Sequence, residues 1–270
     1  MTTTTRFQRA IPFLAVLAAV TALAIGTSWA KQLFPLVGAQ GTTALRVGFS
    51  ALLLLILWRP WRWHLSRADA ISIACYGTTL GVMNLMFYMA IRTLPFGLAV
   101  AIEFAGPLTV AIAASRRRVD FVWLALAGFG LLMLLPLGLE GLGGRALDPV
   151  GVLYALGAAV LWAMYIVFGK RIGHLHAGHS VSLGLLVAAI VVVPVGIAHA
   201  GAALLSPTVL LVGVCVAAIS SAIPISLEMV AMKRLPKEAF GIMISMEPAV
   251  AALLAMGLLD EHLDTRQWLA

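Results

Sequence analysis

The sequence predicts an all-α polytopic membrane protein with a ten-helix transporter fold, built from two inverted repeats of five helices. Three observations lead to this prediction: the apolar composition, the lengths of the apolar runs, and a motif that recurs in the two halves. Of the 270 residues, 62% are hydrophobic and only 11% are charged, against about 25% charged residues in a typical soluble domain. A soluble chain of this size could not bury that much apolar surface.

Nine apolar runs lie along the chain, and each has the length that a helix needs to cross a bilayer. A spanning helix takes about 20 mainly apolar residues, and the runs lack the period-2 alternation of barrel strands. Residues 265–270 resemble the beginning of a tenth span, so we expect nine spans to be present and the tenth to be cut off. The nine spans are expected at residues 10–30, 41–58, 70–91, 94–114, 121–139, 150–168, 180–199, 207–230 and 238–259.

The basic residues predict the orientation of these spans. If successive spans alternate in direction, 13 of the 18 Lys and Arg residues fall on the side of the N-terminus and four on the other, while Arg46 lies within a span. Cytoplasmic loops are enriched in Lys and Arg, so we expect the N-terminus in the cytoplasm. The same rule explains the net charge of +7, which we therefore do not interpret as nucleic-acid binding.

A short motif recurs in the two halves. MAIRTLP at 89–95 and VAMKRLP at 230–236 share Ala, Leu, Pro and a basic position, and Pro107 and Pro248 follow at the same offset. We therefore expect a first repeat at 1–140 and a second at 141–270. Because each repeat has an odd number of spans, the second must have inverted topology. Inverted repeats are typical of secondary transporters, whose sites lie near the midplane between the repeats.

Two acidic residues lie deep in the expected spans, where a charge costs roughly 2.5–3.5 kcal/mol on insertion scales. Glu103 and Glu247 are each about 13 Å from the nearer end of their span, at 1.5 Å per residue. In the repeat alignment Glu247 matches Gly106, one helical turn from Glu103. Pro107 and Pro248 lie beside them and are expected to kink the helices. Both carboxyl groups are therefore expected in one central cavity, although each could instead bond a neighbouring helix in a purely structural role.

Arg46 and several neutral side chains are further candidates. Arg46 lies about five residues into the expected second span, where it could snorkel outward or pair with a carboxylate in the cavity. Glu228 is expected nearer the cytoplasmic interface and is a weaker candidate. Four neutral residues near the midplane could hydrogen-bond a polar substrate or join helices, namely Asn84, Tyr88, Tyr165 and Ser245.

Other motifs predict no chemistry. His174-x-His176-x-x-His179 has metal-ligand types but no clear fourth ligand, so we expect a solvated loop and no metal. The pattern Gly77-x-x-x-Gly81 favours close helix packing. The sequence has no nucleotide-binding motif and no zinc-protease or nucleophile-elbow signature. We therefore expect no cofactor and no enzymatic activity.

Four stretches resemble a known family: SWAKQLFPLVGAQGTTALR (28–46), EFAGPLTVAIAASRRRVDFVW (103–123), LLMLLPLG (131–138) and SMEPAVAA (245–252). The chain resembles EamA-type members of the drug/metabolite transporter superfamily, most closely the exporters of threonine and homoserine in the bacterial inner membrane. The resemblance implies ten helices in two inverted repeats around a central cavity, and a small amino-acid substrate. It leaves a homodimer open.

These observations together predict a secondary active exporter of small amino acids that exchanges substrate for protons by alternating access. A buried carboxyl group is easier to protonate than one in water, so one Glu could bind either a proton or the substrate amine. Arg46 with Asn84 or Tyr88 could bind the substrate carboxylate. The alternatives are an exporter of other small metabolites or drugs on the same fold, an intramembrane enzyme, and a passive channel.

Overall fold

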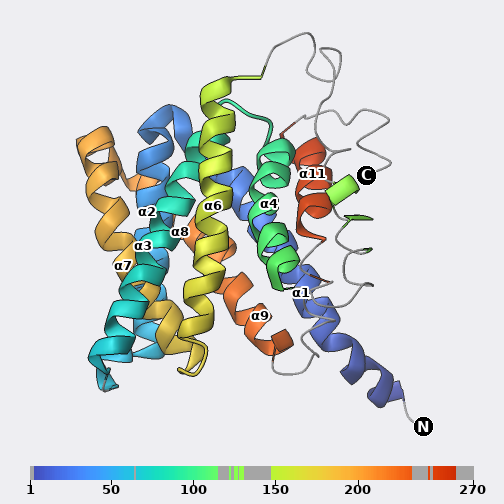
Figure 1. The fold of residues 1–270 in the computed structure, drawn as a ribbon. Coiled ribbons are helices and arrows are strands. Elements are labelled where there is room, and N and C mark those ends of the chain that lie inside the picture. Colours follow the sequence, from blue (N-terminus) through green and yellow to red (C-terminus); the bar gives the residue numbers. More distant parts are fainter. Residues whose placement is uncertain are drawn as a thin grey trace.

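Helices make up all the regular structure in the part of the chain that the computed structural model describes, which is residues 3–63, 65–114, 122, 125–126, 128–130, 147–232, 243 and 246–259. The long helices (Figure 1) are α1 (Thr3–Ala30), α2 (Phe34–Trp58), α3 (Arg67–Ala90), α4 (Phe96–Ala114), α6 (Pro149–Arg171), α7 (Ala177–Ala200), α8 (Pro207–Ala217), α9 (Ile223–Met232) and α11 (Glu247–Leu258). Short helical turns are η1 (Lys31–Leu33), η2 (Pro60–Arg62), η4 (Gly201–Leu205) and the π-helical η5 (Ala218–Ala222).

The described helices are suited to a bilayer. Six segments among the described residues are long and apolar enough to cross a membrane, and the first of them contains both α1 and α2. Large apolar side chains such as Leu153, Ile190 and Leu211 are exposed on the outside of the bundle. A water-soluble bundle would turn such residues inward. The expectation of a helical, multi-pass membrane protein is therefore confirmed at this level.

The second expected span, residues 41–58, agrees with the regular part of α2. Helix α2 covers Phe34–Trp58, but it consists of two helices that meet at a kink at Gly38, whose φ is 69°. Phe34-Pro35 begin the first, short piece, because Pro is tolerated in a first turn. Arg46 lies eight residues after the kink, in the second piece, and its side chain is buried.

The remaining expected spans agree with the helices to within a few residues where the structure describes them. Most of the fifth expected span, the first part of the ninth and residues 265–270 lie outside the described residues. The eighth expected span is one continuous path through α8, η5 and α9. Its middle is a π-helical turn, which the apolar pattern did not indicate.

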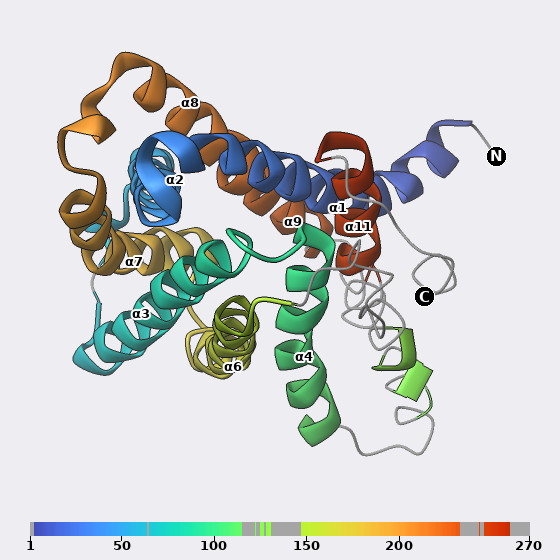
Figure 2. The same cartoon turned by 90° about the horizontal axis from the view of Figure 1, so that it is seen from above.

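Packing between helices follows a regular scheme, and Figure 2 shows it from above. Helix α2 packs on α7, α3 on α6 and α7, and α4 on α6, while α1 packs on α9 and α11. Helix α2 also packs on α8, and α11 on α4. Gly77 and Gly81 of α3 lie against the backbone of Gly184 and Ala188 in α7, where a β-carbon would overlap Gly184 and crowd Ala188. The predicted role of these two glycines in close packing is confirmed.

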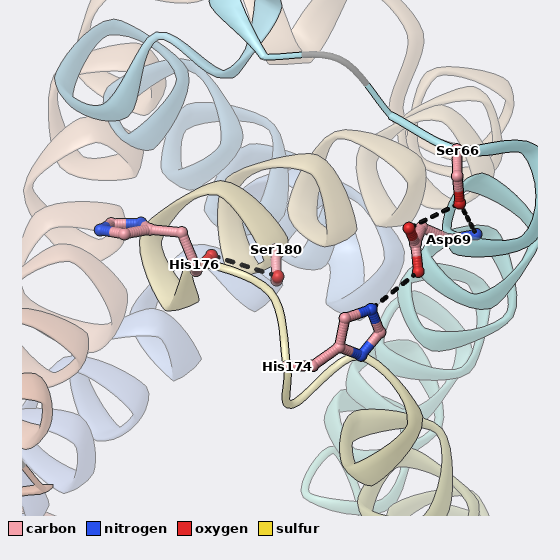
Figure 3. Close-up of polar contacts among 5 residues, drawn as sticks. All are labelled: Ser66, Asp69, His174, His176 and Ser180. Atoms are coloured by element: carbon pink, nitrogen blue, oxygen red, sulfur yellow. Dashed lines mark hydrogen bonds and ion pairs between the residues drawn. The ribbon is translucent and has the colours of Figure 1, made fainter.

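One end of the bundle is joined by contacts between two loops (Figure 3). Ser66 Oγ accepts a hydrogen bond from the Asp69 backbone N–H at the start of α3, and the Asp69 carboxylate lies 3.1 Å from His174 Nε2 in the α6–α7 connection. The His176 ring packs at a tilt against the rings of Trp58 and His179. The histidines expected in a solvated loop thus include two that pack on aromatic rings.

At the opposite end of the bundle, Asp148 caps the N-terminus of α6. The Asp148 carboxylate accepts hydrogen bonds from the backbone N–H groups of Val150 and Gly151 at the start of α6. A hydrogen bond from Thr93 and these backbone N–H groups hold the pKa of Asp148 below its ordinary value. This contact joins the α3–α4 connection to α6, at the end of the bundle away from His174.

Candidate functional site

The centre of the candidate site is the side chain of Arg46, which is only 9% exposed. Its Nη1 donates a hydrogen bond of 2.7 Å to Asn84 Oδ1 of α3. Its Nε donates to Ser220 Oγ at 2.9 Å, and Nη2 donates to the Ser220 carbonyl at 3.3 Å. Arg46 therefore joins α2, α3 and η5 inside the bundle, and the reading in which it snorkels to the outer surface is wrong for this structure.

Tyr88 forms one wall of this site. Its side chain is fully buried, and the Arg46 guanidinium carbon lies 5.4 Å from the centre of its ring. That distance is within the range of a cation–π contact. The Tyr88 hydroxyl group makes no hydrogen bond of standard geometry among the described residues, and its polar neighbours are the side chains of Thr27 in α1 and Arg46. It therefore lies between a hydroxyl group and a cation inside the bundle.

Asn84 is held by its own helix. Its Nδ2 donates a hydrogen bond of 2.8 Å to the carbonyl of Leu80, one turn earlier in α3. The amide oxygen therefore faces away from that carbonyl and is available to Arg46. Asn84 and Tyr88 are four residues apart and share one face of α3, which is why both reach the same guanidinium.

Glu103 and Glu247 come from different helices and interact electrostatically. Their expected place in one central cavity stays a prediction. Glu103 is 7% exposed in α4, and the Glu247 carboxylate and the Arg46 guanidinium both lie within electrostatic range of it. Glu247 occupies the first turn of α11, and α11 packs on α4. The structure therefore brings two acidic groups and one basic group from different helices to one region inside the bundle.

The prolines beside these residues have different positions. Pro107 lies inside α4, four residues after Glu103, so it removes the N–H that would normally bond the Glu103 carbonyl. Pro248 lies in the first turn of α11, where a helix accommodates proline without strain. A kink at Pro248 stays a prediction, since most of the expected helix before it is outside the described residues.

Two expected site residues lie elsewhere. Tyr165 of α6 stacks on Tyr76 of α3 with ring centres 4.7 Å apart, and the two hydroxyl groups are 2.9 Å from each other. Tyr76 precedes Asn84 by two turns, so this tyrosine pair is separate from the Arg46 contacts. Ser245 lies outside the described residues.

Sequence reasoning missed Ser220 and Thr27. Ser220 and Ser221 are adjacent hydroxyl residues in the middle of an apolar run, and Thr27 follows Gly26 in α1. Serine and threonine occur often inside membrane helices, where they bond their own backbone, so they carry little signal singly.

Comparison with known proteins decides the family. The threonine/homoserine exporters RhtA of Salmonella typhimurium (strain LT2) and Escherichia coli (strain K12) are each 46% identical to the chain over 260 residues. Each alignment covers 96% of the chain and 87% of the relative, and residues 149–270 match the EamA-like transporter family. The chain belongs to the EamA-like transporter family.

Membership in the EamA-like family confirms the resemblance inferred from the four stretches and places the chain among transporters and not among enzymes. A solved crystal structure aligns with 97% of the chain and 91% of its own length, with a TM-score of 0.65 at 17% identity. That likeness supports the fold alone.

Proposed function

We propose that this EamA-like protein is a secondary active exporter of small amino acids of the threonine/homoserine type, driven by exchange for protons. The single observation that carries the proposal is the arrangement of Arg46, Glu103 and Glu247 inside an apolar bundle. A zwitterionic amino acid needs both an anionic and a cationic partner to leave water. The names of the 46% identical relatives supply the substrate class.

The chemistry follows from the charges. The guanidinium of Arg46 suits the substrate carboxylate, because its planar fork matches two carboxylate oxygens. Glu103 or Glu247 then balances the substrate amine. The two carboxylates interact electrostatically, so a proton on one removes negative charge that stabilises an ammonium group at the other. Loading of one therefore weakens binding of the other, which is a simple form of antiport.

The architecture that we propose is the 5+5 inverted repeat, with repeats at 1–140 and 141–270. The packing scheme supports it, because exchanging the halves maps several of the helix contacts onto one another. The contact of α3 with α6 corresponds to that of α9 with α1, α4 with α6 to α11 with α1, and α3 with α7 to α8 with α2. A substrate would bind between the repeats, where Arg46 and Ser220 meet.

The proposed location is the bacterial inner membrane, with the N-terminus and the end that carries His174 in the cytoplasm. Among the described residues, the cytoplasmic side carries seven basic residues and the opposite side two. The seven are Arg6, Arg9, Arg59, Arg62, Arg67, Lys170 and Arg171, and the two are Lys31 and Arg92.

Cysteine labelling tests the orientation. In a background with Cys75 and Cys215 replaced by Ser, a membrane-impermeant thiol reagent applied to intact cells is expected to modify Arg92→Cys and to spare Arg171→Cys. Both positions are exposed, so access and not burial decides the result. Modification of position 171 with protection of position 92 would invert the proposed topology.

Transport itself is tested in inverted membrane vesicles. When the vesicle interior is acidified by one pH unit, labelled threonine is expected to accumulate inside up to about tenfold, because one unit supplies 1.36 kcal/mol for a one-to-one exchange. A protonophore should abolish the accumulation. Equal concentrations on both sides despite the gradient would indicate a channel, and accumulation of other metabolites without threonine would support the broader exporter.

A further inference from the structure

Among the residues of the second half that the structure describes, Ser220 is the hydrogen-bond partner of Arg46. Ser220 accepts two hydrogen bonds from it, to Oγ from Nε at 2.9 Å and to the backbone carbonyl from Nη2 at 3.3 Å. Both acceptors therefore contact the same edge of the planar guanidinium. Two hydrogen bonds from neighbouring nitrogen atoms fix the rotation of the guanidinium as well as its position.

The Ser220 carbonyl is available because of Pro224. In a regular helix this carbonyl would accept a hydrogen bond from the N–H of residue 224, and proline has none. The backbone here is the π-helical turn η5, in which the Ile223 N–H bonds Ala218 instead. π-Helical turns occur frequently at functional sites, and buried backbone carbonyls need a partner. Arg46 supplies it.

The Ser220 hydroxyl is also oriented toward Arg46. It donates its only proton to the carbonyl of Val216 at 2.6 Å, so its oxygen acts as an acceptor for Arg46 Nε. Gly26 of α1 fixes the turn from the other side, since a β-carbon on Gly26 would overlap Ser220. The turn is thus held against α1 and directed at α2.

We infer that Ser220 is a positioning residue that holds the Arg46 guanidinium for a substrate carboxylate, an inference that rests on the proposed function. Arginine has five N–H donors, and three hydrogen bonds to described residues use Nε, Nη1 and Nη2. Two N–H groups, one on each Nη, are left for the two oxygens of a carboxylate. Because Asn84 belongs to the first half and Ser220 to the second, the receptor for the carboxylate is complete only when both halves are in place.

The test compares threonine with threonine amide, which lacks the carboxylate charge. In proteoliposomes, each unlabelled compound competes with exchange of labelled threonine. The half-inhibition concentration of the amide divided by that of threonine measures how well the carboxylate is recognised. Ser220→Ala is expected to weaken competition by threonine roughly tenfold and to leave the amide unchanged, so that the ratio falls. Ser221→Ala, in the same turn and also buried, is the matched control and should keep the wild-type ratio.

Pro224→Ala is the second variant, in case Ser220→Ala does not accumulate. It returns an N–H donor for the Ser220 carbonyl and should lower the ratio by less than Ser220→Ala does. If Ser220 had a purely structural role, the variant would weaken competition by both compounds equally and leave the ratio unchanged. That result would overturn the inference, whereas threonine exchange by the wild type would still support the proposed function. Absence of threonine exchange by the wild type would overturn both.

Discussion

Replacing Glu103 with Gln is expected to abolish export driven by a pH gradient and to leave exchange of threonine for threonine in place. Gln keeps the shape of the side chain and removes a group that costs free energy to bury when charged, so the variant should accumulate normally. Glu103 lies in the interior of α4 and is almost completely buried, a position suited to a group that carries a proton. Only the proton step should be lost.

The Glu247→Gln variant is expected to lose both modes of transport. Glu247 lies at the N-terminus of α11, where the helix dipole favours a negative charge. A carboxylate in that position suits the permanent charge of a substrate amine. A neutral amide cannot balance a buried ammonium group, so substrate binding itself should fail.

The measurement is labelled-threonine transport in proteoliposomes, with and without a pH gradient. Asp69→Asn is the control, because it removes a carboxylate at the end of the bundle, where Asp69 contacts His174, and it should retain both modes. Wild-type proton-driven export in both single Gln variants would exclude the carboxylate mechanism. The two acids would then be structural, and Glu228 and Arg46 would be the next candidates.

Replacing Gly106 with Ala is expected to destabilise the protein by about 1–3 kcal/mol. A β-carbon at Gly106 would overlap the backbone carbonyl of Ala159 in α6, and a backbone atom cannot move aside as a flexible side chain can. Gly→Ala inside a helix normally stabilises a protein by roughly 0.5–1 kcal/mol. Packing against α6 therefore reverses the sign of the expected change in stability. Gly106→Leu should prevent accumulation of the folded protein.

Thermal unfolding in detergent, followed by size-exclusion chromatography, checks this prediction. Gly257 of α11 is the matched control, because no atom that the structure describes outside its own helix lies within 4 Å of a β-carbon built there. Gly257→Ala should leave the midpoint unchanged or raise it. A midpoint for Gly106→Ala equal to that of Gly257→Ala would show that α4 and α6 can separate at no cost.

The candidate site was predicted unevenly, for a physical reason. Glu103, Glu247 and Arg46 were found because a charge in a long apolar run is costly and stands out without any knowledge of the fold. Asn84 and Tyr88 were found as polar residues at a similar depth. Ser220 was missed because a serine in an apolar run can satisfy its hydroxyl on its own helix, and it does so here with Val216.

Tyr165 shows the limit of arguments from depth alone. Its position along the span was compatible with the site, but α6 turns it toward Tyr76, and no periodicity in an apolar helix indicates which neighbour a face will contact. Hydropathy likewise did not indicate the kink at Gly38, where the two pieces of α2 meet.

By itself, the sequence determined that the protein is a helical membrane protein, where most of its spans lie, and which charged residues are buried in them. These properties depend on transfer of side chains from water to a bilayer, which composition and run length measure directly. Only the tertiary structure decided that Arg46 bridges α2, α3 and η5, and that Glu103, Glu247 and Arg46 share one region. Those contacts depend on the rotation and register of each helix against its neighbours, which are fixed by small residues such as Gly26, Gly77 and Gly106 and leave almost no trace in hydropathy.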